Sequence, residues 1–255
     1  MRVNLFLARL RNQWLRARLK HRNLNPLARK NLGALDNLNA SAKARSLRYV
    51  VVDLETTGLD LNRDRVVSLG AFRVAEGRIR LGDMFNELVN PEHEISHSSI
   101  KTHGIVPDMV AESRLATEVF EDFLAFLGAD VLVAHHARFD LHFMNKVIQR
   151  RHGFPLQNLV IDTALLCKGL KFLPPPYPMS IRFEDELYSL DSLAEHFDIE
   201  IYPRHSALGD ALATAMIFQR MLAFLERGGK GLLRNLVHMG GVAPRSHFSA
   251  RWWWP

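Results

Sequence analysis

Short apolar runs alternate with stretches of helical spacing along most of the chain, and this pattern predicts a mixed α/β protein. The first run is apolar and β-branched or aromatic throughout, which is typical of a strand buried on both faces. The dipeptide Glu76-Gly77 between the second and third runs predicts a tight hairpin turn. The five predicted strands are residues 49–52, 65–75, 78–89, 130–134 and 159–162.

Apolar residues recur at three- and four-residue spacing between and after the later strands. Residues 96–109 predict short helical stretches broken by Gly104 and Pro107, and the proline-rich residues 172–180 predict a loop. The longer predicted helices are residues 117–127, 141–151, 163–170, 190–197 and 206–225. This order favours a mixed sheet flanked by helices, with three antiparallel strands first and later strands parallel to the first. The opening strand then lies centrally.

The first part of the chain has a different pattern. One helical stripe predicts an amphipathic helix over residues 3–19, and it comprises Val3, Phe6, Leu7, Leu10 and Trp14. The helical spacing of apolar residues does not continue in residues 23–46, which predict a linker with one weak helical turn. We therefore expect a leader and linker over residues 1–47, a main domain over residues 48–228 and a tail over residues 229–255.

Charge separates the leader from the rest of the chain. Residues 1–48 carry twelve Lys and Arg against one acid, a charge of +11, whereas the remainder carries 21 against 26, a charge of −5. A basic amphipathic leader is compatible with a docked helix, an organelle transit peptide, or contact with nucleic acid, a membrane surface or a protein partner. The Trp252-Trp253-Trp254 tail is a second candidate for a protein contact.

Composition indicates the cellular compartment and restricts the kinds of ligand that a metal site in this chain could have. Cys167 is the only cysteine, so the chain forms no internal disulfide or thiolate cluster, and a metal would need oxygen or nitrogen ligands. No run of about 18 apolar residues and no signal-peptide pattern occurs, so we expect a cytoplasmic protein without a membrane span.

Two acids leave the end of the first predicted strand. Asp53 and Glu55 are two residues apart, so their side chains point to the same side of the sheet. Their carboxylates repel unless a cation lies between them, and a hard divalent metal suits such ligands. An isolated Asp-x-Glu pair more often caps a turn, so further residues must decide between the two interpretations.

Two more carboxylates complete a candidate metal site. Asp140 follows the strand predicted beside the first, and Asp210 lies in the first turns of the last long helix. Four carboxylates can bind two divalent cations that activate a water and stabilise the leaving oxygen in an in-line displacement. His205 lies five residues before Asp210, and an imidazole is suited to accept the water's proton at neutral pH.

The motifs in this order resemble those of the DEDDh family of 3′–5′ exonucleases, which includes the proofreading epsilon subunit of bacterial DNA polymerase III and RNase T. The resemblance covers roughly residues 48–226. It consists of D-x-E-T-T-G at 53–58, H-G-I at 103–105, H-x-x-x-F-D at 135–140 and H-x-x-x-x-D at 205–210. It implies an RNase H-like α/β fold with a mixed five-stranded sheet. It also implies that the four acids are metal ligands and that His205 is the general base.

The resemblance also implies a substrate and a cofactor. We expect hydrolysis of single-stranded or frayed 3′ ends of DNA or RNA to nucleoside monophosphates, with two Mg²⁺ ions that Mn²⁺ can replace. The expected substrate-binding residues are Thr56, Thr57, Gly58, His103 and Phe139. Ordinary turn and core roles remain alternatives for several of them. His136 departs from the family's usual asparagine. A short-RNA trimming enzyme and a non-catalytic scaffold for a polymerase or regulatory partner are the alternative functions.

Overall fold

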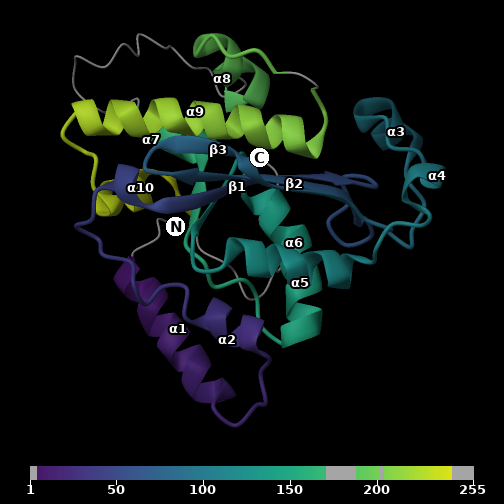
Figure 1. The fold of residues 1–255 in the computed structure, drawn as a ribbon, viewed down its shortest axis with the longest axis horizontal. Helices are drawn as coiled ribbons and strands as arrows, with labels where there is room; N and C mark the ends of the chain where they lie inside the picture. The colour runs from purple at the N-terminus through teal and green to yellow at the C-terminus, as the bar shows by residue number, and fades with distance from the viewer. Residues whose placement is uncertain (1–4, 171–187, 202–203, 243–255) are drawn as a thin grey trace.

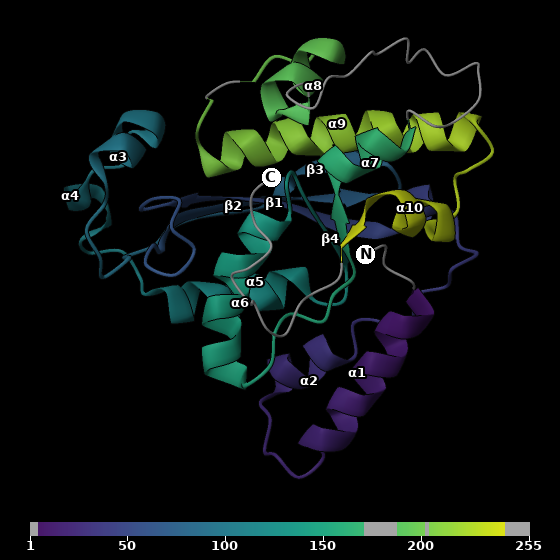
Figure 2. The same cartoon turned by 180° about the vertical axis from the view of Figure 1, so that it is seen from behind.

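The computed structural model describes residues 5–170, 188–201 and 204–242, and it contains one twisted sheet with helices on both faces (Figures 1 and 2). The strand order is β3-β2-β1-β4-β5-β6, so β1 lies inside the sheet as predicted. The strands are β1 (Arg48–Thr56), β2 (Val66–Ala75), β3 (Arg78–Leu88), β4 (Val131–Ala134), β5 (Val160–Asp162) and β6 (Gly241–Val242).

The predicted fold class is confirmed. β1, β2 and β3 pair antiparallel, while β4 pairs parallel to β1 and β5 parallel to β4. Glu76 and Gly77 both have positive φ, 54° and 66°, as a tight hairpin turn requires. The sheet has one strand more than the predicted five, because the short β6 pairs antiparallel with β5. A two-residue strand gives no periodic signal in the sequence.

Alternate residues of β1 separate two apolar cores. Tyr49 and Val51 face the layer of α7, α8, α9 and α10, whereas Val50 and Val52 face α5 and α6 on the opposite side. Every one of these β1 side chains is fully buried, which explains the continuous apolar run. The helices are α5 (Ala116–Leu127), α6 (Arg138–His152), α7 (Thr163–Leu170), α8 (Leu190–His196), α9 (Ala207–Arg227) and α10 (Leu233–Gly240).

The two short helices α3 (His97–His103) and α4 (Pro107–Val110) follow the hairpin, as the breaks at Gly104 and Pro107 predicted. Ser96 caps α3 by accepting a hydrogen bond from the Ser99 amide. Both helices lie at the edge of the molecule beyond the far end of β2 (Figure 1). This places the H-G-I segment at the end of the sheet where β1 terminates.

The leader packs against the main domain. It forms α1 (Leu5–Leu19) and α2 (Pro26–Leu32), and Asn25 caps α2 by accepting from the Ala28 amide. The linker after α2 contributes Leu35, Leu38 and Ala44 to the core shared with β1 and α9. α1 thus agrees with the prediction, while α2 is longer than the single weak turn expected.

The described part of the predicted tail is also integrated, since α10 packs on α7 and β6 extends the sheet. The proline-rich residues 172–180 and the Trp252-Trp253-Trp254 segment lie outside the described residues. α9 meets the length and hydropathy of a membrane span, but more than half of its apolar window is buried inside the molecule. It is the core helix of the upper layer in Figure 1.

Candidate active site

The predicted acid pair lies at the end of β1 and faces α9. Asp53 and Glu55 continue the alternation that directs Tyr49 and Val51 toward that helix layer. Single carboxylate oxygens of Asp53, Glu55 and Asp210 all lie within 4.8 Å of one another. The fold therefore brings three of the four predicted metal ligands together, two from β1 and one from α9.

α9 reaches the acid pair because β2 has no side chain at the point of contact. Gly70 lies opposite Asp53 in the antiparallel ladder. A Cβ on Gly70 would lie 2.3 Å from the backbone of Ala207 and Leu208, the first turn of α9. Ser206 caps this turn by accepting from the Gly209 amide at 3.1 Å. Asp210 is thereby fixed one turn into the helix.

Asp140 approaches from the other helix layer. It lies in the first turn of α6, after a connection in which His136 adopts a left-handed φ of 53°. Asp162 holds this connection, because its Oδ2 accepts from the Ala137 amide at 3.0 Å and its Oδ1 from the Ala164 amide at 2.9 Å. Asp140 lies close enough to raise the pKa of Asp53, but it is not part of the 4.8 Å group of the other three acids.

Burial raises the pKa of all four acids, and neighbouring carboxylates add to this effect at Asp53, Glu55 and Asp140. Burial and the charges of neighbouring acids, Asp140 first among them, raise the pKa of Asp53 well above its usual range. Burial, followed by Asp210, raises the pKa of Glu55 to about 7. Burial also raises the pKa of Asp140 and Asp210. A group of carboxyls with such raised pKa values is stabilised when a cation binds or when some of the carboxyls stay protonated.

Arg204 supplies a positive charge to this site. Its guanidinium pairs with Asp210 through Nη1, and its Nε donates to Asp191 Oδ1 at 2.5 Å. The Coulombic effect of Arg204 lowers the pKa of Asp53, Glu55 and Asp210, opposing burial. The sequence analysis did not identify Arg204, although its position next to His205 was a signal.

His205 lies in the approach to α9, two residues before the helix begins. It is exposed and has a left-handed φ of 58°. Arg204 Nη1 donates to its Nδ1 at 3.4 Å. His205, through its side chain when protonated and through its backbone amide, is among the groups that lower the pKa of Asp210, so it lies beside that carboxylate.

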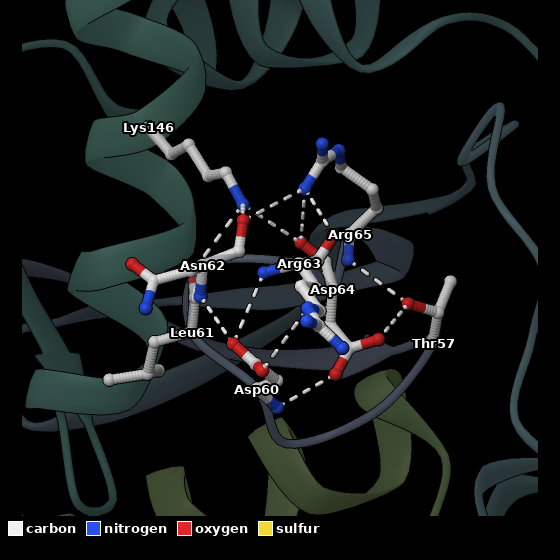
Figure 3. Close-up of polar contacts among 8 residues, drawn as sticks. All are labelled: Thr57, Asp60, Leu61, Asn62, Arg63, Asp64, Arg65 and Lys146. Atoms are coloured by element: carbon white, nitrogen blue, oxygen red, sulfur yellow. Dashed lines mark hydrogen bonds and ion pairs between the residues drawn. The ribbon is translucent and has the colours of Figure 1, made fainter.

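The Thr-Thr-Gly motif forms the base of a tightly bonded loop between β1 and β2, shown in Figure 3. Thr57 Oγ1 donates to Asp64 Oδ1 at 2.7 Å and accepts from the Arg65 amide at 3.1 Å. Thr56 Oγ1 donates to the Gly58 carbonyl at 2.7 Å. A Cβ on Gly58 would lie 2.4 Å from Asp64 Oδ2, so any other residue here would displace the Asp64 carboxylate. Both hydroxyls therefore shape the loop.

Lys146 of α6 fastens the same loop from the side (Figure 3). Its ammonium donates to the carbonyls of Asn62 at 2.6 Å, Asp64 at 3.1 Å and Leu61 at 3.3 Å. α6 thus carries Asp140 at its start and a loop anchor less than two turns later. Sequence reasoning missed Lys146 and Asp64, because bonds to backbone carbonyls leave no motif.

His103 and Phe139 have structural contacts at the predicted substrate pocket. His103 Nε2 donates to the Thr56 carbonyl at 3.2 Å while its Nδ1 accepts from the Ile105 amide at 3.0 Å. The H-G-I segment is therefore tied to the end of β1. Phe139 is partly buried and packs on Phe143 with ring centroids 4.9 Å apart.

The acid group fits a hard divalent cation. Carboxylate oxygens from Asp53, Glu55 and Asp210 are the donors that Mg²⁺ and Mn²⁺ prefer. Within the described ranges, Asp210 Oδ1 is a buried oxygen without a hydrogen-bond partner. A buried acceptor of this kind is costly unless it finds a proton donor or a cation. The predicted ligands thus suit the predicted cofactor.

Comparisons with known proteins agree with this geometry. DNA polymerase III PolC-type from Thermotoga petrophila is 33% identical over 203 residues, covering 80% of this chain and 14% of that protein. The DNA polymerase III subunit epsilon-like protein of Rhodobacter capsulatus is 38% identical over 187 residues, covering 72% of this chain and 25% of that protein. The chain therefore spans a quarter or less of the length of these relatives.

Escherichia coli Exonuclease I, solved in complex with a dT13 oligonucleotide, shares the fold with a TM-score of 0.60 at 16% identity. The superposition covers 71% of this chain and 42% of that one. A family model described as Exonuclease matches residues 50–218, which lie within the predicted main domain and contain all four acids and His205. The chain therefore belongs to this exonuclease family.

Proposed function

We propose that the protein is a metal-dependent 3′–5′ exonuclease that releases nucleoside monophosphates from single-stranded or frayed 3′ ends. The observation that carries the proposal is the group of Asp53, Glu55 and Asp210 oxygens within 4.8 Å. Asp140 interacts with Asp53, and the exposed His205 lies beside Asp210. Family membership and the DNA polymerase III relatives support the same reaction.

Each residue has a defined part in the proposed mechanism. Asp53, Glu55, Asp140 and Asp210 would hold two Mg²⁺ ions. When bound, the ions supply charge neutralisation at the scissile phosphate and activation of the attacking water. His205 accepts the water's proton from its exposed position next to Asp210. Arg204 offsets part of the acid charge, and its pairs with Asp191 and Asp210 fix the position of its guanidinium.

The substrate end would lie against the β1–β2 loop and the H-G-I segment. The Thr56, Thr57 and Gly58 backbone forms the floor of this position, and the His103 bond to Thr56 holds the two segments together. Phe139 offers only its partly exposed edge, because Phe143 covers part of the ring. We propose that these five residues position the terminal nucleotide mainly through backbone shape.

The test uses oligonucleotides labelled at either end, as DNA and as RNA, with Mg²⁺, with Mn²⁺ and with chelator. A 5′-labelled strand should shorten stepwise, and a 3′-labelled strand should release a labelled mononucleotide first. Asp210→Asn should be inactive, while Asp122→Asn, which removes only an exposed ion pair with Arg114, should match the wild type. Internal cuts or activity in chelator would contradict the proposal. The DNA and RNA arms decide between a DNA-directed enzyme and an RNA-trimming one.

The scaffold alternative predicts binding without hydrolysis. The four acids, His205 and the loop hydrogen bonds are all in place, so nothing in the described site favours a degenerate nuclease. A polymerase partner is a further proposal, supported by the DNA polymerase III relatives. Co-purification with a polymerase subunit would test it separately from activity.

A further inference from the structure

The leader helix α1 turns its apolar stripe outward. The sequence stripe of Phe6, Leu7, Leu10 and Trp14 remains 65%, 57%, 46% and 63% exposed, respectively. Phe6, Leu10 and Trp14 are spaced four residues apart and so lie on one face. These four belong to the ten large apolar side chains that are exposed in the described residues, and the other six are spread over the rest of the molecule. The stripe is a concentrated apolar surface.

The opposite face of α1 anchors the helix, largely through polar side chains. Asn12 Nδ2 donates to Gln157 Oε1 at 3.2 Å, and Arg9 Nε donates to the Leu35 carbonyl at 3.2 Å. Arg16 Nε donates to the Leu32 carbonyl at 2.9 Å, and its guanidinium pairs with Asp36. Only Leu5 and Leu19 are apolar residues buried at the ends of this face. The helix is therefore held without using its stripe.

The charge around the stripe is of one sign. α1 has no acidic residue, and Arg11 and Arg18 are exposed beside the stripe. The Arg18 guanidinium lies over the Trp14 ring, 5.6 Å from its centroid. Two copies of this helix placed side by side would bring these arginines together, which disfavours a dimer. A partner that binds this surface must therefore offer an apolar region to the stripe and negative charge to the arginines beside it.

The position of α1 favours a broad, flat partner. In both views α1 lies along the outer edge of the molecule, with α2 on its inner side (Figures 1 and 2). An extended surface can therefore reach the whole stripe without contacting the sheet or α9. Nucleic acid fits less well, because Leu7 and Leu10 offer no ring for base stacking and Arg18 already covers Trp14.

We propose that α1 is an interfacial helix that binds an anionic lipid surface. Phe6, Leu10 and Trp14 would enter the boundary between headgroups and acyl chains, while Arg11 and Arg18 would contact lipid phosphates. Long arginine side chains can keep their charged ends at the headgroups while their stems lie along apolar surface. The acid group consists of residues at the end of β1 and in the first turn of α9, and no residue of the α1 stripe belongs to it.

The test is sedimentation of the full chain with vesicles of phosphatidylcholine alone or of an equal mixture with phosphatidylglycerol. The wild type should bind the anionic vesicles and release in high salt, and Leu10→Glu should lower partitioning by about tenfold or more. Arg18→Gln should weaken binding to the anionic vesicles only. Leu81→Glu is the matched control, because Leu81 is 62% exposed on β3, away from α1.

Thermal unfolding and hydrolysis of a short oligonucleotide should be unchanged in Leu10→Glu, which separates this proposal from the nuclease proposal. Absence of binding, or equal binding by Leu10→Glu and wild type, would overturn it. A dimer that Leu10→Glu dissociates would assign the surface to a second copy instead. Loss of oligonucleotide affinity in Leu10→Glu would assign it to nucleic acid, and a protein captured without vesicle binding would assign it to a protein partner.

Discussion

Gly70 lies directly opposite Asp53 in the β1–β2 ladder, and its missing side chain allows the first turn of α9 to approach the sheet. Asp210 reaches Asp53 only because of this close approach. A glycine inside a strand normally weakens the strand, so its presence here has a reason in the geometry of the site.

Gly70→Ala should separate Asp210 from Asp53. The added Cβ would meet backbone at 2.3 Å, which cannot yield as a flexible side chain would. We expect a loss of about 1–3 kcal/mol in unfolding free energy, typical of overpacking, together with loss of metal-dependent activity. Chemical denaturation and the nuclease assay measure both. Gly82→Ala on β3 is the control, since nothing lies within 4 Å of its Cβ position, and equal behaviour of the two variants would refute the argument.

Metal removal should expose the repulsion among the acids. In chelator, Asp53→Asn should unfold at a higher temperature than the wild type, because it removes one of the mutually repelling carboxyls, whose ionisation is disfavoured in the folded state. Mg²⁺ should raise the melting temperature of the wild type and have little effect on the variant. Calorimetry with and without Mg²⁺ checks this. If the wild type and Asp53→Asn respond equally to Mg²⁺, the metal binds elsewhere.

The stability of the metal-free protein should fall as pH rises. The pKa of Glu55 is about 7 in the folded chain and about 4.5 as an ordinary carboxyl, so the folded state retains a proton that the unfolded state loses in this window. Stability from this group is complete below pH 4.5 and is lost as pH rises through about 7. Melting temperatures in chelator should decline across this range, and Glu55→Gln should flatten the decline. An unchanged slope would show that other groups control it.

His205 should be tested with a substitution that tolerates its left-handed backbone conformation. Asparagine tolerates the left-handed φ of 58° better than alanine does, so His205→Asn removes the imidazole with least strain. We expect turnover at neutral pH to fall by about 10²- to 10⁴-fold, with a smaller change in oligonucleotide affinity. Single-turnover rates and binding titrations measure the two separately. An equal loss in both would mean that His205 binds substrate and does not act as the base.

Lys146→Met should loosen the loop that carries the Thr-Thr-Gly motif. Three carbonyls would lose their shared donor. Each would keep one other contact, from His142 to Leu61 at 2.7 Å and from Arg65 to Asp64 at 2.9 Å and to Asn62 at 3.4 Å. We expect about 1–3 kcal/mol of destabilisation and a rise in KM larger than the fall in kcat. Lys230→Met, at an exposed position after α9, is the control. A fall in kcat alone would place Lys146 in the chemical step.

The leader cannot be tested by removing residues 1–46. That deletion would take Leu35, Leu38 and Ala44 out of the core and the hydrogen-bond acceptor of Tyr49 with them, since Tyr49 Oη donates to the Ala44 carbonyl at 2.5 Å. Loss of nucleic-acid affinity in such a truncation would reflect damage to the fold. Single substitutions on the exposed face of α1 avoid this difficulty.

The sequence by itself determined the order of β1 to β5 and of the helices from α3 to α9, the central place of β1 and the shared side of Asp53 and Glu55. These follow from local periodicity, because alternation in a strand and the spacing of apolar residues are set by backbone geometry. The motifs also predicted Asp140, Asp210 and His205 as site residues, and the structure groups Asp210 with the acid pair of β1. Their spacing along the chain carried that information before any contact was known.

Only the tertiary structure decided how these groups meet. Three contacts are of this kind: the close approach of α9 at Gly70, the pair of Arg204 with Asp210, and the bond from Lys146 to the β1–β2 loop. Each joins residues that are far apart in sequence or that belong to no motif. The outward orientation of the α1 stripe was equally hidden. An amphipathic pattern shows that a helix has two faces, but which face contacts the protein depends on the partners that the fold brings to it, here carbonyls of the linker and Gln157.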